Sequence, residues 1–417
     1  MKYDGASPGG DGESETGRTG RDLRPGRMEK DETAEGLRCP MKKRRCGGCS
    51  QLEVPYREQL RRKQRAVEGL LGRFCRPEPI LGMETPLHYR NKAIATFSAA
   101  PRGALTCGIY EAHTHRVVPV RDCLLQDGRI NEIIAAALRA AVRCRLAAYD
   151  EDGRTGVLRH MVVRRGAATG EVSVAVVTAS DFFPAGRDFT RLLLRSCPDV
   201  VTVVQNVNPR HTSAVLGTRE RVLFGQGYLT DRLCGNTFRV STRAFYQVNP
   251  AQTERLYGTA LEFAALTGKE RGIDAYCGIG TIALTAAPRA AAVLGVELNG
   301  DAVRDARRNA RINRRENAEF VRGDAGEFMA GLAAEGETAD LVFLDPPREG
   351  ADRRFLASLS RLRPGRIVYI SCEPSTLARD LSFLCAKGYA VRRARPVDMF
   401  PYTGHVETVV LMSRVRD

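Results

Sequence analysis

A cysteine stands where a short apolar run ends near the C-terminus, in the segment IVYISCEPSTLARD. The β-branched and aromatic residues from Ile367 to Ile370 predict a buried strand, and Pro374 suits the first turn of a following helix. Cys372 is therefore expected at the carboxyl end of a strand, the edge at which open α/β sheets bind ligands. For a cysteine taken alone, a small buried structural thiol is the competing interpretation.

A glycine-rich turn predicts a ligand at the same edge. The segment DAYCGIGT follows an apolar run, and Gly278, Gly280 and Ala283 have the G-x-G-x-x-A spacing. Such a turn lets the backbone approach a ligand and directs helix N–H groups towards it. Glu297 ends the next predicted strand, where a carboxylate can accept hydrogen bonds from both ribose hydroxyls, and a solvated strand-end charge is the alternative. A nucleotide-type cofactor fits this pattern, which a dinucleotide oxidoreductase would share.

The segment VFLDPPR narrows the choice of cofactor. Its apolar run delivers Asp345 to the same edge, and two prolines fix the loop and remove backbone donors, which suits a pocket for a flat base. Loops of the DPP type resemble those of nucleic-acid methyltransferases, and a second half-site for nicotinamide is not evident in the sequence. The sequence therefore favours S-adenosylmethionine over NAD, with a plain turn residue as the alternative for Asp345.

Methylation of uracil gives a reason for a thiol and a carboxylate to share that edge. Carbon 5 of uracil is a poor nucleophile towards a methyl sulfonium, but a thiolate that adds to carbon 6 turns the ring into a reactive enolate. A base must then remove the proton from carbon 5 so that the thiol can leave. Glu407, in HVETVV, enters the last predicted strand and can be that base beside Cys372. Without such a partner it would be an ordinary edge-strand charge.

Alternating strands and helices are expected to position these residues. The predicted strands are GIDAYCGIG, AVLGVELN, AEFVRGDA, ADLVFLDPPR, RIVYISC and VETVVLMSR, and the helices are TIALTAA and GDAVRDARRNARIN. This alternation predicts an α/β fold with βαβ units and a mostly parallel sheet. Between about residues 87 and 235, short runs such as GEVSVAVVT, separated by Gly and Pro, predict a separate domain rich in antiparallel strands.

Composition bounds the class of protein. A chain of 417 residues predicts two or three domains. The 64 Lys and Arg exceed the 49 Asp and Glu by 64 − 49 = 15, which favours a polyanionic partner. No apolar stretch has the length of a membrane span and no apolar signal-peptide core is present, so we expect a cytoplasmic protein. Its twelve cysteines are then expected to be metal-binding, redox or catalytic residues.

Four of these cysteines predict a metal centre. Cys39, Cys46 and Cys49 lie close together in the sequence, and Cys123 is the distant fourth. Three clustered thiolates and a distant one suit an iron–sulfur cluster or a zinc site. Cys75 or Cys107 is the alternative fourth ligand, and scattered structural cysteines are the competing interpretation.

Together these residues resemble those of the RNA (uracil-5-)-methyltransferase family, whose members act on 23S ribosomal RNA or the T loop of tRNA. The similar segments are CGGCSQL, YRNKA, LRHMVVR, FYQVNPAQTERLY, DAYCGIGT, VELN, LDPPR, SCEPSTLARD and HVETVVLM, in the family's order. They extend over nearly everything from Cys39 to the C-terminus. The resemblance therefore covers almost the whole chain.

This resemblance implies a role for each site residue. Cys372 would be the nucleophile and Glu407 the base. The S-adenosylmethionine site would consist of Gln247, Tyr276, Glu297 and Asp345. The 4Fe-4S cluster would have Cys39, Cys46, Cys49 and Cys123 as its ligands. We accordingly expect a disordered polar tail over 1–38, an iron–sulfur and RNA-binding region over 39–238 and a Rossmann-like class I methyltransferase domain over 239–417.

Two departures from the family bear on RNA binding. Six residues separate Cys39 from Cys46, where the family usually has five. The residues given before Cys39 are few and polar, so we do not expect them to form the small β-barrel with which many relatives begin. RNA contacts are then expected from the middle domain and from the basic runs KKRR (42–45) and RRK (61–63). Ribosomal RNA is the favoured substrate, with tRNA as the alternative. A non-catalytic metal-containing RNA-binding protein and a dinucleotide oxidoreductase are the rivals from other classes.

Overall fold

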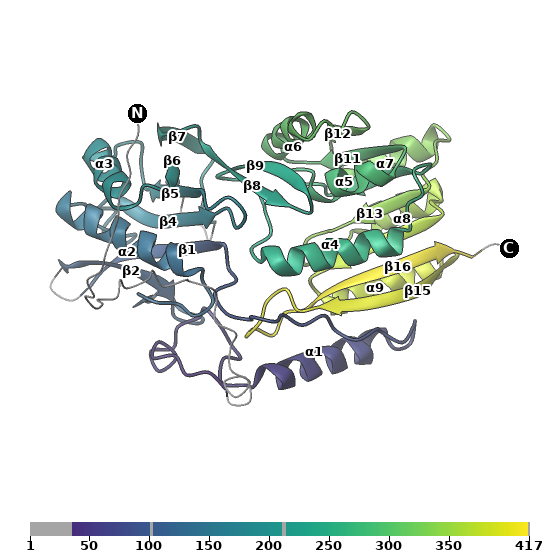
Figure 1. The fold of residues 1–417 in the computed structure, drawn as a ribbon, viewed down its shortest axis with the longest axis horizontal. Helices are drawn as coiled ribbons and strands as arrows, with labels where there is room; N and C mark the ends of the chain where they lie inside the picture. Colours follow the sequence, from purple (N-terminus) through teal and green to yellow (C-terminus); the bar gives the residue numbers. More distant parts are fainter. Residues whose placement is uncertain (1–35, 101–102, 211–213, 416–417) are drawn as a thin grey trace, which may run out of the picture.

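The structure is a computed structural model and describes residues 36–100, 103–210 and 214–415. Its strands form two seven-stranded sheets and a two-stranded sheet, and Figure 1 shows the two large sheets side by side. The predicted tail over 1–38 lies outside the described residues, except for its last three positions. In the part that the structure describes, no helix is long and apolar enough to cross a membrane.

The first sheet occupies the N-terminal half, as the runs of alternating residues predict. Its strands are β1 (Lys92–Ala99), β2 (Leu105–Tyr110), β3 (Val117–Pro119), β4 (Leu158–Arg165), β5 (Val172–Thr178), β6 (Val200–Val207) and β7 (Arg219–Phe224). They follow the order β3-β2-β1-β4-β5-β6-β7, and only the β5–β6 pair is parallel. Helices α2 (Gly128–Arg143) and α3 (Gly186–Ser196) bury an apolar stripe against this sheet.

The second sheet carries the predicted site. Its strands are β10 (Arg271–Ala275), β11 (Ala292–Glu297), β12 (Ala318–Arg322), β13 (Leu341–Leu344), β14 (Arg366–Ser371), β15 (Tyr389–Val397) and β16 (Glu407–Arg414). In the order β12-β11-β10-β13-β14-β16-β15, the first five are parallel and β16 runs antiparallel to both neighbours. The predicted mostly parallel sheet is confirmed. Strand order reverses between β10 and β13, and that switch point is where such sheets bind ligands.

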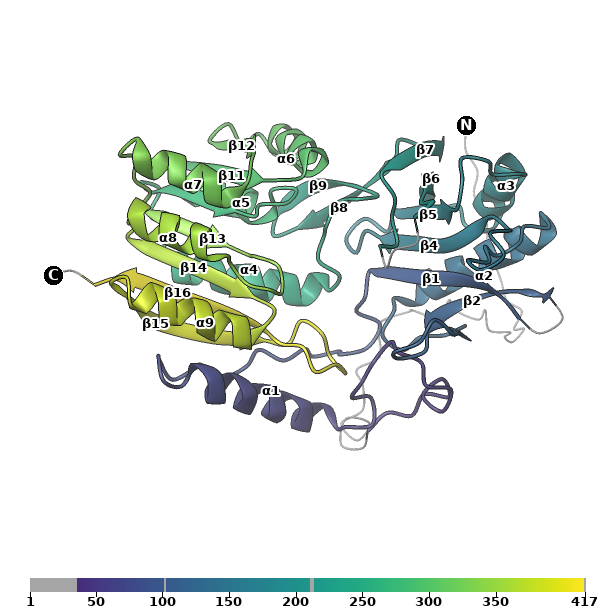
Figure 2. The ribbon, with the colours of Figure 1, turned by 180° about the vertical axis from the view of Figure 1, so that it is seen from behind.

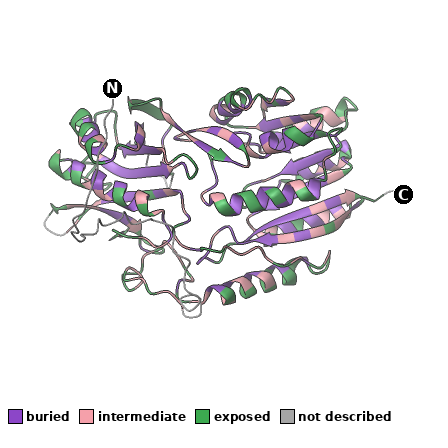
Figure 3. Cartoon of the chain, in the orientation of Figure 1, coloured by how far each residue is buried: buried purple, intermediate pink, exposed green. Residues whose placement is uncertain are grey.

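Helices cover both faces of the second sheet. One core contains residues of α4 (Pro250–Ala264), α5 (Thr281–Ala286), the short 3-10 helix at Ala287–Arg289 and α6 (Gly300–Ile312). The opposite core contains residues of α1 (Tyr56–Leu71), α7 (Ala325–Ala334), α8 (Arg353–Leu362) and α9 (Pro374–Cys385). Figure 2 shows α7, α8 and α9 in front of the sheet and α1 along its lower edge, and Figure 3 shows most of the strands between the layers as buried. The result is a three-layer α/β architecture.

Helix α7 and strand β15 are two of the elements of this half that the sequence prediction lacks. Helix α7 separates β12 from β13, where two consecutive strands are expected from the sequence, and its alanines and glycines give it only a weak apolar stripe. Strand β15 forms an edge, and its arginines at positions 392, 393 and 395 conceal the alternation that marks a strand. Both elements are defined by packing and pairing with distant segments, which a local pattern does not record.

A hairpin connects the two large sheets. It consists of β8 (Tyr228–Leu233) and β9 (Asn236–Ser241). Its apolar residues join the core beneath α4 and α6. The side chains of Asn309 on α6 and of Asn313, which caps that helix, accept its backbone N–H groups at 2.8 Å. The division at 238/239 falls within β9, and that boundary stays a prediction.

A buried ion pair joins α1 to the loop between β15 and β16. Lys63 Nζ lies 2.6 Å from Asp398 Oδ1 and donates to the carbonyl oxygen of Phe400 at 3.1 Å. Tyr56 donates to Asp398 Oδ2 at 2.7 Å, and both side chains of the ion pair are almost fully buried. Lys63 therefore cannot serve RNA binding in the basic run 61–63, and that part of the expectation is wrong.

The rest of this loop is fastened by side chains from other segments. We call Asp398–Tyr402 the bracket. Gln59 accepts the N–H of Tyr402 at 2.8 Å, whereas Tyr89 donates to the carbonyl of Pro401 at 2.9 Å and Asn249 to that of Met399 at 2.9 Å. The backbone N–H groups of Ser50 and Gln51 donate to the carbonyl of Tyr402. The bracket thus joins three parts of the chain: residues 39–51, which we call the cysteine-containing segment, helix α1 and the start of α4.

Removing one member of the ion pair should be costly. We expect Lys63→Met to lower the free energy of unfolding by about 3 kcal/mol, because the Asp398 carboxylate is left buried without its cation. Lys269→Met, on an exposed lysine, is the matched control. Because the chain contains no tryptophan, urea unfolding is best followed by far-UV circular dichroism. Equal stability of the two variants would contradict the account.

Candidate active site

Cys372 and Glu407 lie at the same end of two paired strands. Strand β14 ends at Ser371, whose partner in β16 is Thr408, and one residue further along stand Cys372 and Glu407. Glu407 is buried and Cys372 half-buried. The two side chains that the sequence assigns to nucleophile and base are therefore neighbours, as their chemistry requires.

Two further carboxyl groups converge on this edge. Asp345 directly follows β13, whose last residue, Leu344, pairs with Ala275 of β10 and Tyr369 of β14. Asp274 is fully buried in β10; its Oδ2 accepts the N–H of Ala283 at 2.9 Å, and its Oδ1 has no partner among the described residues. Burial raises the pKa of Asp274 to about 8, and the Asp345 and Glu297 charges add to that effect.

Charge repulsion among these groups affects the thiol as well. Burial, followed by the charges of Glu407 and Asp345, raises the pKa of Cys372 to about 11, whereas the Arg348 guanidinium lowers it. Burial and the Asp345 charge also raise the pKa of Glu407, and burial raises that of Asp345. The edge therefore carries more potential negative charge than its described surroundings balance. A cationic ligand would relieve this excess.

The glycine loop has the backbone conformation that a close-approaching ligand needs. Gly280 has φ +84°, and a Cβ at this position would lie 2.7 Å from the ring of Phe320, so the glycine is required. Tyr276 adopts φ +67°, which is a strained conformation for a non-glycine residue. The carboxylate of Glu297 accepts the N–H of Gly278 at 3.1 Å and that of Asn299 at 2.7 Å. The loop and Glu297 are thereby fixed relative to one another.

Gln247 reaches the same region from a distant part of the chain. It lies between β9 and α4, is buried, and contacts the hydroxyl of Tyr257. That hydroxyl lies 3.3 Å from Thr281 Oγ1 at the start of α5, and the nearby Asp345 charge contributes to raising the pKa of Tyr257. The structure thus brings Gln247 together with the glycine loop and Asp345, as the resemblance implies.

Helix α9 supports the loop that follows Asp345. Thr376 donates to the carbonyl of Arg348 at 3.0 Å, and the buried carboxylate of Asp380 accepts the N–H of Ala351 at 2.9 Å and the hydroxyl of Tyr369 at 2.7 Å. Glu373 caps the helix. The segments LDPPR and SCEPSTLARD are therefore parts of one hydrogen-bonded unit that places Arg348 beside Cys372.

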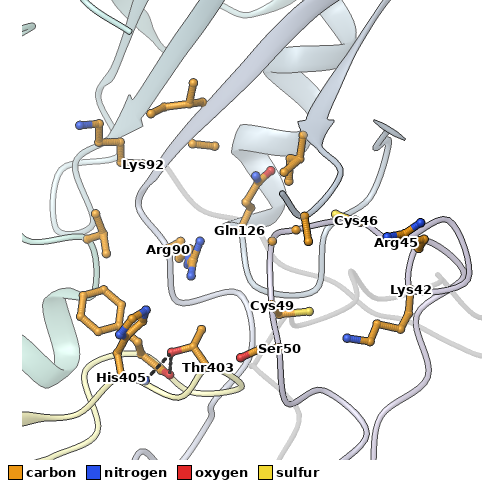
Figure 4. A pocket seen from close by; sticks show the side chains of 18 of the residues that line it. Lys42, Arg45, Cys46, Cys49, Ser50, Arg90, Lys92, Gln126, Thr403 and His405 are labelled. Atoms are coloured by element: carbon orange, nitrogen blue, oxygen red, sulfur yellow. Dashed lines mark hydrogen bonds between the residues drawn. The ribbon is translucent and has the colours of Figure 1, made fainter. Parts of the chain in front are cut away.

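A large cavity lies next to this edge. It has a volume of about 1000 Å³ and is lined by residues of the cysteine-containing segment, of the segment entering β1 and of the loop before β16. Figure 4 shows Lys92, Arg90 and His405 along one side and Lys42 and Arg45 along the other. Arg348 also lines it, so the cavity adjoins the sheet edge that carries Cys372.

The four predicted metal ligands gather at the border of that cavity. Cys39, Cys46, Cys49 and Cys123 all line one small pocket, and the charges of Cys123, Cys46 and Cys39 each raise the pKa of Cys49. Within the described residues, however, no three Cys, His, Asp or Glu side chains are arranged closely enough to hold a metal ion.

The two alternative fourth ligands lie elsewhere. Cys75 packs against the core beneath α8 and α9, and Cys107 is buried in the core of the first sheet. Neither lines the pocket that the other four cysteines share. Their positions leave Cys123 as the fourth member of the set.

Several residues at the site have no role in the sequence prediction. Arg348 and His405 stand inside the motifs LDPPR and HVETVVLM, and Asp274 stands inside the first predicted strand, yet their types alone did not indicate a function. A carboxylate in the middle of a buried strand was the available signal for Asp274. Tyr257, on α4, carried no such signal.

The fold and the site agree with the known proteins that this chain resembles. A family model described as tRNA (uracil-5-)-methyltransferase matches residues 214–415. An uncharacterised RNA methyltransferase of Halalkalibacterium halodurans is 41% identical over 372 residues, which are 88% of this chain and 81% of that protein. Another from Bacillus cereus is 40% identical over 399 residues, 94% of this chain and 86% of that protein.

A solved structure is similar over nearly the same extent. The tRNA (uracil-54, C5)-methyltransferase of Pyrococcus abyssi, in complex with S-adenosyl-L-homocysteine, has a TM-score of 0.74 and 27% identity, covering 88% of this chain and 86% of that one. The fold is therefore that of a class I methyltransferase. The chain belongs to the RNA (uracil-5-)-methyltransferase family and is an RNA methyltransferase.

The raised pKa of Glu407 predicts a dependence of stability on pH. A carboxyl group whose pKa is higher in the folded than in the unfolded chain stabilises the fold below its ordinary pKa of 4.5 and loses that contribution as the pH rises. We expect the melting temperature of the wild type to fall between about pH 5 and about pH 8. Glu407→Gln should show a smaller fall, and the exposed control Glu316→Gln should follow the wild type. Equal falls in melting temperature with pH for all three proteins would contradict the raised pKa of Glu407.

Proposed function

We propose that this enzyme transfers a methyl group from S-adenosylmethionine to carbon 5 of a specific uridine in RNA, through a covalent adduct with Cys372. The observation that carries the proposal is the adjacency of Cys372 and Glu407 at the ends of β14 and β16, beside Asp345 and the glycine loop. A nucleophile and a base facing one ring are what methylation of carbon 5 requires.

Gln247, Tyr276, Glu297 and Asp345 are the proposed cofactor residues. Bound there, S-adenosylmethionine supplies a methyl group on a positively charged sulfonium. The burial of Asp345 and Asp274 with little positive charge around them favours such a cation. Glu297 has two oxygens that each accept one backbone N–H, which leaves lone pairs for ribose hydroxyls.

The protein groups act in a fixed order in this mechanism. The thiolate of Cys372, favoured by the Arg348 guanidinium, forms a bond to carbon 6 and moves an electron pair to carbon 5. Carbon 5 takes the methyl group. The carboxylate of Glu407 then removes the proton from carbon 5, and the returning electron pair expels the thiolate from carbon 6. Glu407 then releases the proton to solvent, and both side chains return to their starting forms.

The RNA substrate is proposed to be 23S ribosomal RNA. The cysteine set near the N-terminus, which resembles that of the ribosomal branch, supports this choice. The similar enzyme of Pyrococcus abyssi acts on uracil 54 of tRNA, which makes the T loop of tRNA the alternative. Mapping 5-methyluridine in ribosomal and transfer RNA from a deletion strain distinguishes the two.

A 4Fe-4S cluster is proposed for Cys39, Cys46, Cys49 and Cys123. The pocket that the four cysteines share supports this ligand set. Because the described residues are not close enough to hold a metal, the four thiols would have to move towards one another when the cluster binds. The cluster would fix the cysteine-containing segment beside the large cavity. Methyl transfer from a sulfonium needs no electron transfer, so its role would be structural.

Glu407→Gln should trap the reaction after methyl transfer. The amide cannot accept the proton on carbon 5, so the methylated uridine should stay bonded to Cys372. We expect an RNA–protein adduct that survives a denaturing gel and carries the transferred methyl group. The double variant with Cys372→Ala should form none. Free turnover by Glu407→Gln would exclude this residue as the base.

Cys49→Ser tests the cluster. Protein purified without oxygen should contain iron and acid-labile sulfide and absorb visible light, and the variant should lose all three. Cys75→Ser is the matched control, because Cys75 lies outside the shared pocket. Stoichiometric zinc without sulfide in the wild type would replace the iron–sulfur proposal with a zinc site.

A further inference from the structure

The segment Tyr89–Lys92 contains polar groups that lack partners in the protein. It matches the motif YRNKA, to which the reaction assigns no role. Arg90 Nε and both polar atoms of the Asn91 side chain are buried without a hydrogen-bond partner among the described residues. Buried polar groups are normally paired, so three such atoms in adjacent residues mark a segment whose polar groups the described protein does not satisfy.

Lys92 adds an unbalanced charge to this segment. Burial, together with the neighbouring Arg164 guanidinium, lowers its pKa to about 8. The two residues are partners in the β1–β4 register, so two cations are held side by side. Within the described part of the chain, Arg164 donates only to the carbonyl oxygens of Ser241 and Ala244, and burial lowers its pKa to about 10. No described carboxylate compensates this pair.

The adjoining cavity has the same deficit of negative charge. Arg90, Lys92, Lys42, Arg348 and His405 line it, and none of its described lining residues is an aspartate or a glutamate. Arg45 is the exception among the basic residues, because its side chain already pairs with Glu111 at 3.0 Å. Among the described residues, Arg90 and Lys92 on one side of the cavity and Lys42 on the other have no such carboxylate partner.

The side of the cavity with Arg90 and Lys92 leads to the catalytic edge. The charges of Arg348 and Arg90 both lower the pKa of His405, so these two arginines act on one imidazole. Arg348 also acts on the Cys372 thiol. In Figure 4, Arg90 lies between Lys92 and His405. A row of positive groups thus extends from β1 to the nucleophile.

We propose that Arg90 and Lys92 bind backbone phosphates of the RNA next to the target uridine and hold the strand as that uridine enters the catalytic edge. This inference rests on the proposed function. A phosphate in the cavity would pair with the Lys92 ammonium and the Arg90 guanidinium and place its charge near Arg164. Binding of phosphates would also give a reason for the basic lining of a cavity that lies beside an edge rich in carboxyl groups.

A lysine that binds RNA and a lysine that supports the fold differ in their effect on thermal stability. Because burial without a counter-ion lowers the pKa of Lys92, its charge costs stability in the RNA-free protein. Lys92→Met should therefore melt at the same or a higher temperature than the wild type and still bind RNA more weakly. A lysine with only a structural role would show the opposite change in melting temperature.

The test compares Lys92→Met and Arg90→Gln with Arg354→Gln. Arg354 is exposed on α8 and lies outside the cavity, so it controls for net charge. The probe is a fluorescein-labelled single-stranded RNA of about 20 nucleotides, titrated at several KCl concentrations. Each lost phosphate contact should reduce the slope of log K against log[KCl] by about 0.7, whereas the control should keep the wild-type slope.

A second measurement distinguishes this proposal from the methylation chemistry. With saturating RNA, both cavity variants should form the 5-methyluridine product at a rate within about two-fold of the wild type, with a raised KM. Salt slopes equal to that of Arg354→Gln, or a loss confined to kcat, would overturn the phosphate assignment. If the wild type makes no 5-methyluridine, the proposed function fails, while the salt slopes still decide whether Arg90 and Lys92 contact RNA.

Discussion

The ion pair between Lys63 and Asp398 is the constraint on which the rest of the site depends. Glu407 is the first residue of β16. The loop that leads to it begins at Asp398 and belongs to neither neighbouring strand, so sheet hydrogen bonds do not fix its position. Instead, α1 supplies a cation and two polar side chains, the cysteine-containing segment supplies two N–H groups, and Tyr89 and Asn249 supply donors. A buried charge left unpaired is costly, so the loop has one favourable arrangement. Glu407 is thereby held beside Cys372.

Charge is divided between two adjoining regions. At the sheet edge, burial and mutual repulsion raise the pKa of several carboxyl groups, which suits a cationic methyl donor. Across the loop that carries Arg348, the cavity is lined by basic groups and suits a polyanion. In the proposed mechanism, the target uracil passes from the second region to the first. Arg348 stands at their border and acts on both Cys372 and His405.

The sequence could predict which site residues stand at the carboxyl ends of strands. Cys372, Asp345 and Glu297 each follow a short apolar run, and parallel strands bring such positions to one edge, so their convergence follows from periodicity and topology. Lys63 could not be foreseen, because a lysine in the run RRK looks solvated until a partner 335 residues away is known. The sequence likewise gives no sign that polar atoms of Arg90 and Asn91 are buried without partners, because burial and pairing depend on the three-dimensional structure. The role of Gln247 came from resemblance alone.

The central claim is that Cys372 forms the bond to the RNA. Fluorine at carbon 5 cannot be removed as a proton, so RNA containing 5-fluorouridine should trap the wild-type enzyme in the presence of S-adenosylmethionine. Digestion with trypsin and mass spectrometry then locate the attached nucleotide. The account predicts it on the peptide Ile367–Arg379, whose only cysteine is Cys372. Attachment to the peptide that contains Cys277, or methylation of RNA without any adduct to Cys372, would contradict it.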